Sequence, residues 1–380
     1  MPQKTNILLF QRLIPHYRVA LFKKLHEKLG IVVCHSRARK GASLQEQQEL
    51  DFPNEVLPRV YFGRSATAMR QCVRPILKKY RPSVVITEFS LSYITFWCLF
   101  LLRKIFHYKL VVWTHGVKSK EMLQPFSSRQ SKMQLWVYNK ADAVILYSPK
   151  RKELLAQRIN QPGKLFLASN TLDTDTLYKI YNQLAAKGKT VVKEELDFRH
   201  QFNFVFIGRL VHAKRLDLLL EAFKAIPEKF DVALHIVGSG PEEEKIKAET
   251  AAHDNILYHG PIHELELSSK YLFASDLMVM PGYVGLSVVH AMAMGCPVLT
   301  CEQTSEGPHH SPEVEYIHDG ENGLFCDYSV EGLKKAMMNL LLQPEKMAAM
   351  SSEARKTIRE EADIEHFVSG FEEAVRYVGD

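Results

Sequence analysis

The stretch at residues 280–298, MPGYVGLSVVHAMAMGCPV, constrains the fold of this chain more than any other. It predicts the end of a buried strand at 277–280, a glycine-containing loop, one helix, and a further strand at 298–300. Residues 285–287 would open the helix, where backbone N–H groups lack intrahelical partners and the helix dipole adds positive charge. Such a turn is a ready phosphate site, although an ordinary strand-to-helix turn in an α/β domain shows the same pattern.

Length and composition describe a globular chain. It has 380 residues, 46% of them hydrophobic, which is enough for two or three domains. No apolar run reaches the roughly 18 residues that a membrane span needs. The apolar residues 6–10 are too few for a signal-peptide core. The six cysteines show neither metal-binding spacing nor a disulfide framework, so we expect a reducing cytoplasm.

The charge is divided unevenly along the chain. Residues 1–180 hold 30 Lys and Arg against 11 Asp and Glu, whereas residues 181–380 hold 19 against 32. A basic half of this kind suggests an anionic partner. The sequence has no helix-turn-helix, zinc or RNP-type motif, so we expect no nucleic acid. An anionic membrane surface or an acceptor that carries phosphate fits better, and a solvated basic surface without a partner is the alternative.

The first half alternates strands and helices. Short apolar strands followed by helices predict a parallel, doubly wound sheet, in which ligands lie beyond the carboxyl ends of the strands. Glu88 and His115 lie at two such ends. Residues 35–60 are polar and read as a loop. The expected strands are 6–10, 31–34, 84–87, 110–113 and 143–146, and the expected helices are 18–29, 67–80 and 133–139.

Residues 93–102 form an expected helix that is apolar nearly all round and is followed by Arg103 and Lys104. A helix of this composition is usually buried against a sheet. The functional alternative is an interfacial patch with basic flanks.

The second half repeats the alternation after a polar segment at 176–202. We expect a first Rossmann-like domain at 1–180, a hinge at 181–202, a second Rossmann-like domain at 203–362, and a C-terminal helix at 363–380 that can pack back on the first domain. The second domain has expected strands at 204–207, 233–237 and 256–258, helices at 216–226, 241–250, 333–342 and 348–360, and a closing helix at 364–377. The predicted architecture is α/β, with the two doubly wound domains facing each other across a cleft.

Three expected strand ends in the second domain carry phosphate-binding chemistry. Gly208 and Arg209 follow one strand, with Lys214 five residues later, and a glycine turn at 238–241 follows the next. The loop at 281–286 is the third. A bidentate guanidinium, an ammonium and backbone N–H groups can together hold a diphosphate without a metal. Each turn alone would be structural by default, so the combination carries the inference.

At these residues the chain resembles the retaining GT-B glycosyltransferases of glycosyltransferase family four. The resemblance covers most of residues 200–330 and is thinner in the first half. The matching runs are 206–214, 236–241, 256–260, 274–281, 285–286 with 291–298, and 319–325, and in the first half 14–18, 114–116 and 170–173.

The resemblance implies sugar transfer from a nucleotide-diphosphate sugar, with retention at the anomeric carbon. Arg209 and Lys214 would hold the diphosphate, and His115 would lie beside the transferring sugar. The remaining donor-side residues would be Gly208, Gly238, Gly260, Ile262, Gly285, Leu286, Ser287 and His290, and Tyr17, Arg18 and Glu88 would lie on the acceptor side. By this resemblance no metal or other cofactor is expected. The acceptor would be a glycan or polyprenyl-linked glycan of lipopolysaccharide O-antigen or capsule synthesis, used at the inner face of the cell membrane.

The chain departs from the family at two positions. Family members usually carry two glutamates that are separated by seven residues and flank the loop, and here Gly282 and His290 stand in their places. The first glutamate normally lies near the donor sugar and the second holds the ribose hydroxyls. A histidine can also hydrogen-bond a ribose; a half-buried helix histidine is the structural alternative.

Two further segments resemble metal sites. Asp173 and Asp175 form an acidic pair, but they fall at a turn that resembles the family's interdomain junction. Residues 306–313 include adjacent histidines, whose side chains would point to opposite faces of a strand, so we expect a loop beside the donor pocket.

Other functions on the same fold remain open from the sequence. One is a sugar-nucleotide epimerase or a phosphorylase, the latter requiring a lysine for pyridoxal phosphate. Another is a non-catalytic nucleotide-sugar binding protein, which the loss of both glutamates makes conceivable.

Overall fold

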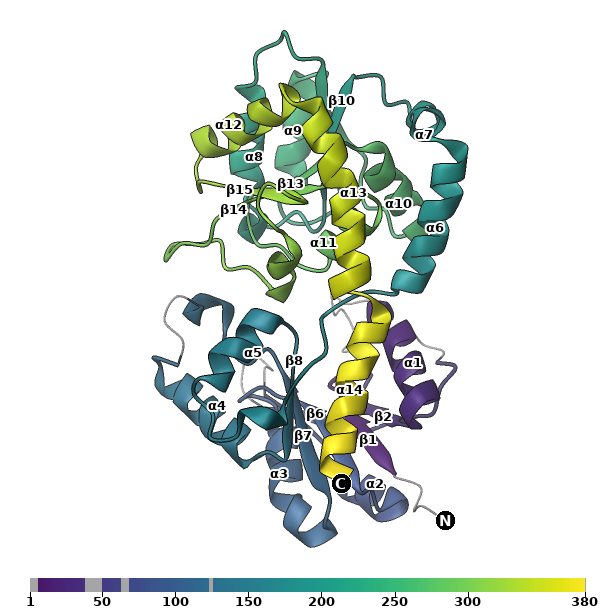
Figure 1. Ribbon diagram of the computed structural model, residues 1–380, viewed down its shortest axis with the longest axis vertical. Coiled ribbons are helices and arrows are strands. Elements are labelled where there is room, and N and C mark those ends of the chain that lie inside the picture. Colours follow the sequence, from purple (N-terminus) through teal and green to yellow (C-terminus); the bar gives the residue numbers. More distant parts are fainter. Residues whose placement is uncertain (1–5, 38–49, 63–67, 123–125, 380) are drawn as a thin grey trace. The chain divides into compact units, whose positions relative to one another are not determined.

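The computed structural model describes residues 6–37, 50–62, 68–122 and 126–379. The chain divides into two compact units (Figure 1). Unit 1 comprises Met1–Asp173 and Ile364–Asp380, and unit 2 comprises Thr174–Asp363. Each unit is a parallel sheet with helices packed on it, so the predicted α/β class with two Rossmann-like domains is confirmed.

Unit 1 is built on a seven-stranded sheet in the order β3-β2-β1-β6-β7-β8-β9. Its central strands are buried along their whole length, as parallel strands covered on both faces must be. Because all the strands run in one direction, the residues that follow them gather at one edge. The strands are β1 (Ile7–Phe10), β2 (Val32–His35), β3 (Asn54–Val56), β6 (Val84–Glu88), β7 (Lys109–Thr114), β8 (Ala143–Leu146) and β9 (Leu165–Leu167).

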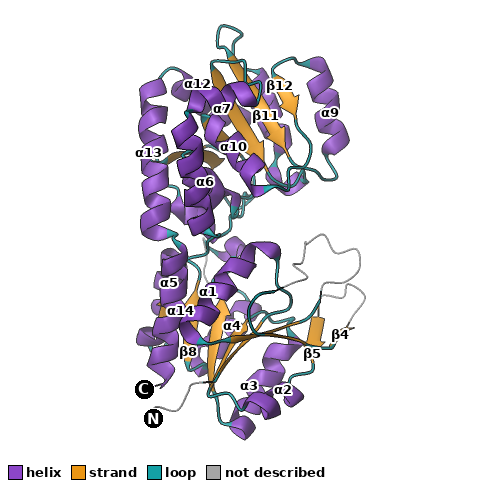
Figure 2. Ribbon diagram, turned by 90° about the vertical axis from the view of Figure 1, so that its right-hand side faces the viewer, coloured by secondary structure: helices purple, strands orange, loops and turns teal. Residues whose placement is uncertain are grey.

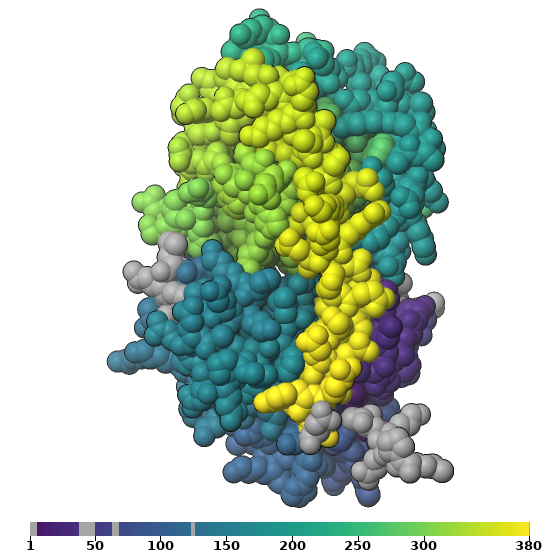
Figure 3. Space-filling view, in the orientation of Figure 1, coloured from purple at the N-terminus to yellow at the C-terminus, as the bar shows by residue number. Residues whose placement is uncertain are grey.

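The helices of unit 1 include the last helix of the chain. Helix α14 packs against α1, β8 and β9, and Figure 3 shows it (yellow) beside α1 (purple). The Phe367 and Phe371 rings lie 5.7 and 5.1 Å from the Trp113 ring. These aromatic contacts bring residues 364–379 into the unit 1 core. The helices are α1 (Val19–Leu29), α2 (Arg74–Tyr80), α3 (Ile94–Phe106), α4 (Arg129–Lys140), α5 (Pro149–Ala156) and α14 (Ile364–Gly379).

Unit 2 has a six-stranded parallel sheet in the order β12-β11-β10-β13-β14-β15, with helices alongside it (Figure 2). The strands are β10 (Phe202–Ile207), β11 (Val232–Val237), β12 (Ile256–Tyr258), β13 (Leu277–Met280), β14 (Val298–Cys301) and β15 (Gly323–Cys326). The helices are α6 (Thr174–Lys187), α7 (Lys189–Glu195), α8 (Leu216–Lys224), α9 (Glu243–Ala252), α10 (Leu265–Ala274), α11 (Ser287–Ala293), α12 (Val330–Leu341) and α13 (Pro344–Glu361).

The predicted loop at 35–60 and helix at 67–80 are partly wrong. Residues 54–56 form strand β3, and β4 (Arg59–Phe62) pairs antiparallel with β5 (Ala68–Gln71). Helix α2 therefore begins only at Arg74, where Pro75 suits the first turn of a helix. Pairing with neighbouring strands determined the secondary structure of these segments, and the local spacing of apolar residues did not reveal that pairing. Residues 38–49 and 63–67 lie outside the described part.

The predicted hinge at 181–202 also differs from the structure. Helices α6 and α7 occupy most of it and pack against α10. Lys189 and Lys193 both pair with the Asp276 carboxylate, at 2.8 and 3.3 Å. The segment looked polar because its helices bury one face only. The units divide after Asp173 and after Asp363, not at 180 and 362.

Candidate functional site

The carboxyl edge of the unit 2 sheet brings the predicted donor-binding loops together through backbone hydrogen bonds. The Gly208 N–H donates to the Val237 carbonyl at 3.0 Å, and the Leu210 N–H donates to the Ser239 carbonyl at 2.9 Å. The Gly238 N–H donates to the Gly260 carbonyl at 2.9 Å. The loops after β10, β11 and β12 are therefore joined, as the parallel sheet predicts.

Gly238 has a packing role in this edge. A Cβ at this position would lie 1.8 Å from the Gly208 carbonyl oxygen, and its φ of 147° disfavours other residues. Gly260 has a φ of 71° with no atom near its missing Cβ among the described residues, and Ile262 is half-buried beside it. The Gly238 turn thus holds two loop backbones in contact, whereas the Gly260 turn faces open space.

Lys214 directs its ammonium into the loop that follows β13. Its Nζ donates to the Tyr283 carbonyl at 2.6 Å and lies 3.3 Å from Met280 Sδ. Desolvation lowers the pKa of Lys214 to about 8, and the nearby Glu313 carboxylate opposes that shift. Arg209 is exposed and has no ion pair within the described residues. Both cations stand at the edge where an anion could enter.

The loop amides at the start of α11 complete this cationic edge. The helix begins at Ser287, with Leu286 as its N-cap and the Val288 N–H donating to the Gly285 carbonyl. In the described part of the chain no hydrogen bond occupies the N–H groups of residues 285–287. A Cβ at Gly285 would meet only the Tyr283 ring, at 3.7 Å. These donors therefore face accessible space.

Close backbone packing explains why position 282, the first departure from the family pattern, holds a glycine and not a glutamate. The Gly282 N–H donates to the Lys214 carbonyl at 3.1 Å, and the Tyr283 N–H donates to the Ala213 carbonyl at 2.9 Å. A Cβ at Gly282 would lie 2.3 Å from the Ala213 carbonyl oxygen. Any side chain here would push the loop off the segment that carries Lys214.

His290 occupies the second departure and points away from the sheet edge into helix packing. It is buried on α11, and its Nε2 lies 2.8 Å from the Ser269 hydroxyl on α10. That hydroxyl donates to the Leu265 carbonyl, so it accepts from the histidine. Burial lowers the pKa of His290 to about 4, which keeps the ring neutral. This arrangement favours the packing alternative over a ribose contact.

Sequence reasoning missed His310 as a support of the donor loop. Its Nδ1 accepts from the Val284 N–H at 3.3 Å, so the protonated Nε2 donates to the Cys301 carbonyl at 2.9 Å. The Ser311 N–H donates to the Val284 carbonyl, and the Ser311 and Tyr283 hydroxyls are also bonded. The only sequence signal for this supporting role was the pair of adjacent histidines, and the pair did not reveal which imidazole ring is directed into the protein.

The carboxyl edge of the unit 1 sheet gathers the other predicted residues. His115 follows β7, and its exposed ring lies 4.5 Å from the Tyr147 ring, which follows β8. Desolvation and the charges of Arg151 and Arg18 lower the pKa of His115. Tyr17 stands beside Arg18, with its ring 5.9 Å from the guanidinium carbon.

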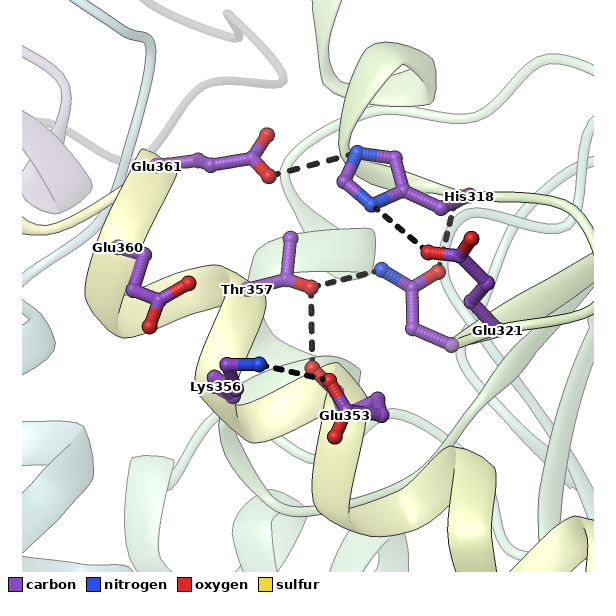
Figure 4. Close-up of a pocket in the computed structure, with 8 residues that line it drawn as sticks. His318, Glu321, Glu353, Lys356, Thr357, Glu360 and Glu361 are labelled. Atoms are coloured by element: carbon purple, nitrogen blue, oxygen red, sulfur yellow. Dashed lines mark hydrogen bonds and ion pairs between the residues drawn. The ribbon is translucent and has the colours of Figure 1, made fainter.

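A separate acidic pocket in unit 2 lies outside these residues. The loop at 318–322 and helix α13 line it, and the Asn322 amide donates to the Thr357 hydroxyl at 2.8 Å (Figure 4). Its lining is His318, Glu321, Asn322, Glu353, Lys356, Thr357, Glu360 and Glu361. Four carboxylates suit no diphosphate. No cluster of His, Cys, Asp or Glu that could hold a metal occurs among the residues that the structure describes.

Two family profiles match the chain in succession. Glycosyltransferase Family 4 matches residues 19–176, and Glycosyl transferases group 1 matches residues 190–357. The uncharacterized glycosyltransferase MJ1059 of Methanocaldococcus jannaschii is 23% identical over 279 residues, 66% of this chain and 64% of that protein. The match thus spans less than two thirds of that relative.

Solved structures share the fold along the whole chain. Anabaena Alr3699/HepE in complex with UDP has a TM-score of 0.71 at 16% identity, covering 98% of this chain and 99% of that one. WaaG, a glycosyltransferase involved in lipopolysaccharide biosynthesis, has a TM-score of 0.65 at 15% identity, covering 98% and 100%.

Two Rossmann-like units, each a parallel sheet with helices packed on it, define a two-domain α/β protein. The protein belongs to the GT-B glycosyltransferases of glycosyltransferase family four.

Proposed function

We propose that this protein is a retaining glycosyltransferase of the hexosyltransferase type, which moves a sugar from a nucleoside-diphosphate sugar to a glycan or lipid-linked glycan. The observation that carries this proposal is the cationic edge of unit 2, where Arg209 and Lys214 follow β10 and the amides of residues 285–287, unoccupied within the described residues, follow the neighbouring strand β13. Relatives support it, because HepE structures hold UDP or UDP-glucose. The place of WaaG in lipopolysaccharide biosynthesis supports a surface-polysaccharide pathway at the inner face of the cell membrane.

The geometry suggests how the reaction proceeds. As the bond from the anomeric carbon to the diphosphate breaks, negative charge grows on the leaving oxygens. Cations and amides already fixed there stabilise that charge more in the transition state than in the ground state. His115, on the edge of unit 1, is neutral and can donate or accept a hydrogen bond to a sugar hydroxyl.

The test begins with a thermal-shift screen of nucleotide-sugars, since ligand at about 100 times its dissociation constant adds roughly 2.7 kcal/mol of stability. Uridine donors come first. Products are then analysed with candidate acceptors, and the anomeric configuration is read by NMR. An α-linked product from an α-linked donor supports a retaining transferase. Isomerised donor, phosphorolysis, or binding without turnover would each replace the proposal with one of the alternative functions.

Transfer should survive metal removal. Because protein cations take the place of a metal at the diphosphate, activity in excess EDTA should remain close to that of the untreated enzyme. The measurement is initial rate before and after chelation. Loss of activity that Mg²⁺ or Mn²⁺ restores would contradict this expectation and return attention to Asp173 and Asp175.

We further propose that unit 1 attaches to an anionic membrane through α3 and α4. No described helix meets the length and apolarity required to cross a bilayer. Leu101 and Ile105 on α3 are 71% and 66% exposed, and Trp136 on α4 packs on Phe100 at 5.5 Å. This apolar face has basic residues beside it: Arg103, Lys104, Arg129, Lys132 and Lys140. Apolar side chains between cations are typical of interfacial binding.

The protein should therefore cosediment with vesicles that contain phosphatidylglycerol and not with pure phosphatidylcholine vesicles. Each Lys or Arg near an anionic surface contributes about 1 kcal/mol, and salt screens that attraction. Leu101→Asp with Ile105→Asp should release the protein from the vesicles. Leu342→Asp is the matched control, because Leu342 is 62% exposed but lies in unit 2. If the double variant cosediments as well as the wild type, the membrane does not bind through this face of α3 and α4.

A further inference from the structure

Arg18 lies at the carboxyl edge of unit 1 with an incomplete set of partners. One terminal nitrogen, Nη2, donates to the Tyr147 hydroxyl at 3.3 Å and to the side-chain Oδ1 of Asn170 at 3.2 Å. The guanidinium carbon lies 4.5 Å from the Trp113 ring centre. The other terminal nitrogen, Nη1, is shielded from solvent and has no acceptor among the described residues. A buried cationic donor without an acceptor is costly, so an anion that accepted from Nη1 would be stabilised there.

No carboxylate lies within ion-pair distance of Arg18 in the described part of the chain. Arg151, a neighbouring cation, is bonded to the Val117 carbonyl and, at 3.1 Å, to the Ser119 hydroxyl. Those contacts tie the two terminal nitrogens of Arg151 to the loop at 117–119 and do not supply an acceptor for Arg18. The positive charge of this edge is therefore incompletely balanced.

Arg12 is a second guanidinium near Glu88, whose carboxyl also interacts electrostatically with Arg18. Its carbon lies 5.0 Å from the Tyr93 ring centre, and its Nε lies 3.2 Å from Glu88 Oε1. Its Nη2 is also shielded and lacks an acceptor within the described residues. Burial raises the pKa of Glu88 even though Arg12 and Arg18 both act to lower it. Glu88 thus pairs with Arg12, and its single carboxylate faces the charges of two arginines.

Arg18 lies near His115, the residue expected beside the transferring sugar. Tyr147 accepts from Arg18, and its ring lies 4.5 Å from His115. The residues that can hold the donor diphosphate, by contrast, belong to unit 2. An anion at Arg18 therefore fits a group on the acceptor better than it fits the donor.

We propose that Arg18, together with Arg12, binds an oxyanion carried by the acceptor, a carboxylate or a phosphate close to the hydroxyl that receives the sugar. This inference rests on the proposed function and names the chemical class of its acceptor. The planar guanidinium fork suits such a group, because two parallel N–H donors match two oxygens of a carboxylate or phosphate.

The test titrates inorganic phosphate and malonate into the full-length protein saturated with UDP, followed by calorimetry. Saturation with UDP occupies the cationic edge of unit 2. We expect saturable binding of at least one probe, and the preferred probe tells a phosphate-bearing from a carboxylate-bearing acceptor. Arg18→Gln should weaken that binding by about tenfold or more, since charge-assisted bidentate pairs are among the strongest hydrogen bonds. Arg18→Lys should bind the probe more tightly than Arg18→Gln does, because lysine keeps the positive charge but lacks the planar pair of N–H donors.

The matched control is Arg158→Gln, which removes one exposed charge of unit 1 outside this edge. It should bind both probes as the wild type does. If Arg18→Gln melts at a lower temperature without probe, Arg12→Gln carries the test, because Arg12 does not bond Tyr147 or Asn170.

Two results overturn the proposal: absence of saturable binding of either probe, or equal binding by wild type, Arg18→Gln and Arg12→Gln. Its failure is distinguishable from failure of the proposed function. If UDP-sugars stabilise the protein and are turned over while neutral acceptors react as well as anionic ones, only the acceptor class is wrong. If no nucleotide-sugar binds, the transferase proposal fails. The binding of phosphate and malonate is then measured without UDP, with Lys214→Ala present in every variant.

Discussion

Replacing Arg209 or Lys214 with alanine should reduce turnover by about 10²–10³, the scale observed when one preorganised donor to a developing negative charge is removed. Both side chains lie at the edge where the diphosphate would leave. The measurement is kcat and kcat/KM with the donor found in the screen, together with the melting temperature. Arg209 is exposed and unpaired within the described residues, so its replacement should leave the fold intact.

The controls for this prediction remove one lysine or one arginine at another place in unit 2. Lys224 pairs with Glu249 and Arg199 pairs with Asp197, both away from the strand-end loops. Their alanine variants should turn over donor at the wild-type rate. Near-wild-type turnover by both Arg209→Ala and Lys214→Ala would show that the diphosphate binds elsewhere.

The same lysine predicts a pH dependence of donor affinity. With a pKa of about 8 in the empty site, Lys214 is mostly charged at pH 7 and loses its proton as the pH rises. A bound diphosphate favours the charged form, so binding is coupled to protonation. Affinity should weaken above about pH 8, and Lys214→Ala should remove that part of the dependence.

Replacing His115 with alanine should lower transfer by about 10² or more while leaving nucleotide-diphosphate affinity nearly unchanged, because a lost hydrogen bond to the transition state acts on rate. His115 belongs to unit 1, whereas Arg209 and Lys214 belong to unit 2. The comparison requires kcat from product formation and the dissociation constant of UDP from calorimetry.

His366→Ala is the control for His115, since His366 is an exposed histidine of unit 1 on α14. It should affect neither quantity. Equal losses of transfer and of nucleotide affinity in His115→Ala would instead mean that the imidazole is structural, supporting Tyr147 and the loop after β7.

The departures from the family pattern show where sequence and structure contribute differently. The sequence predicts that Gly282 and His290 replace glutamates, but their consequences depend on atoms far away in the chain. The Ala213 carbonyl excludes a side chain at 282, and Ser269 draws His290 into the packing of α10 and α11. Neither contact leaves a periodic signal.

Local sequence patterns also gave wrong secondary-structure predictions where the partner of a segment lies far away along the chain. Residues 68–71 have a helical spacing, yet they pair with β4, and the polar segment at 181–202 forms α6 and α7 because Asp276 and α10 supply partners. Propensity is a weak prior that such tertiary contacts override.

By itself the sequence determined the α/β class, the order of the alternating elements, and the strand-end positions of Gly208, Arg209, Lys214 and the 281–286 loop. These follow from apolar spacing and from glycines at turns, which act within a few residues. Only the tertiary structure showed that Phe367 and Phe371 of α14 pack on Trp113, that the Ala213 carbonyl leaves no room for a side chain at position 282, and that Arg12 and Arg18 retain donors without an acceptor among the described residues. Those features arise from contacts between residues remote in sequence, whose burial and hydrogen bonding exist only once the sheets have formed.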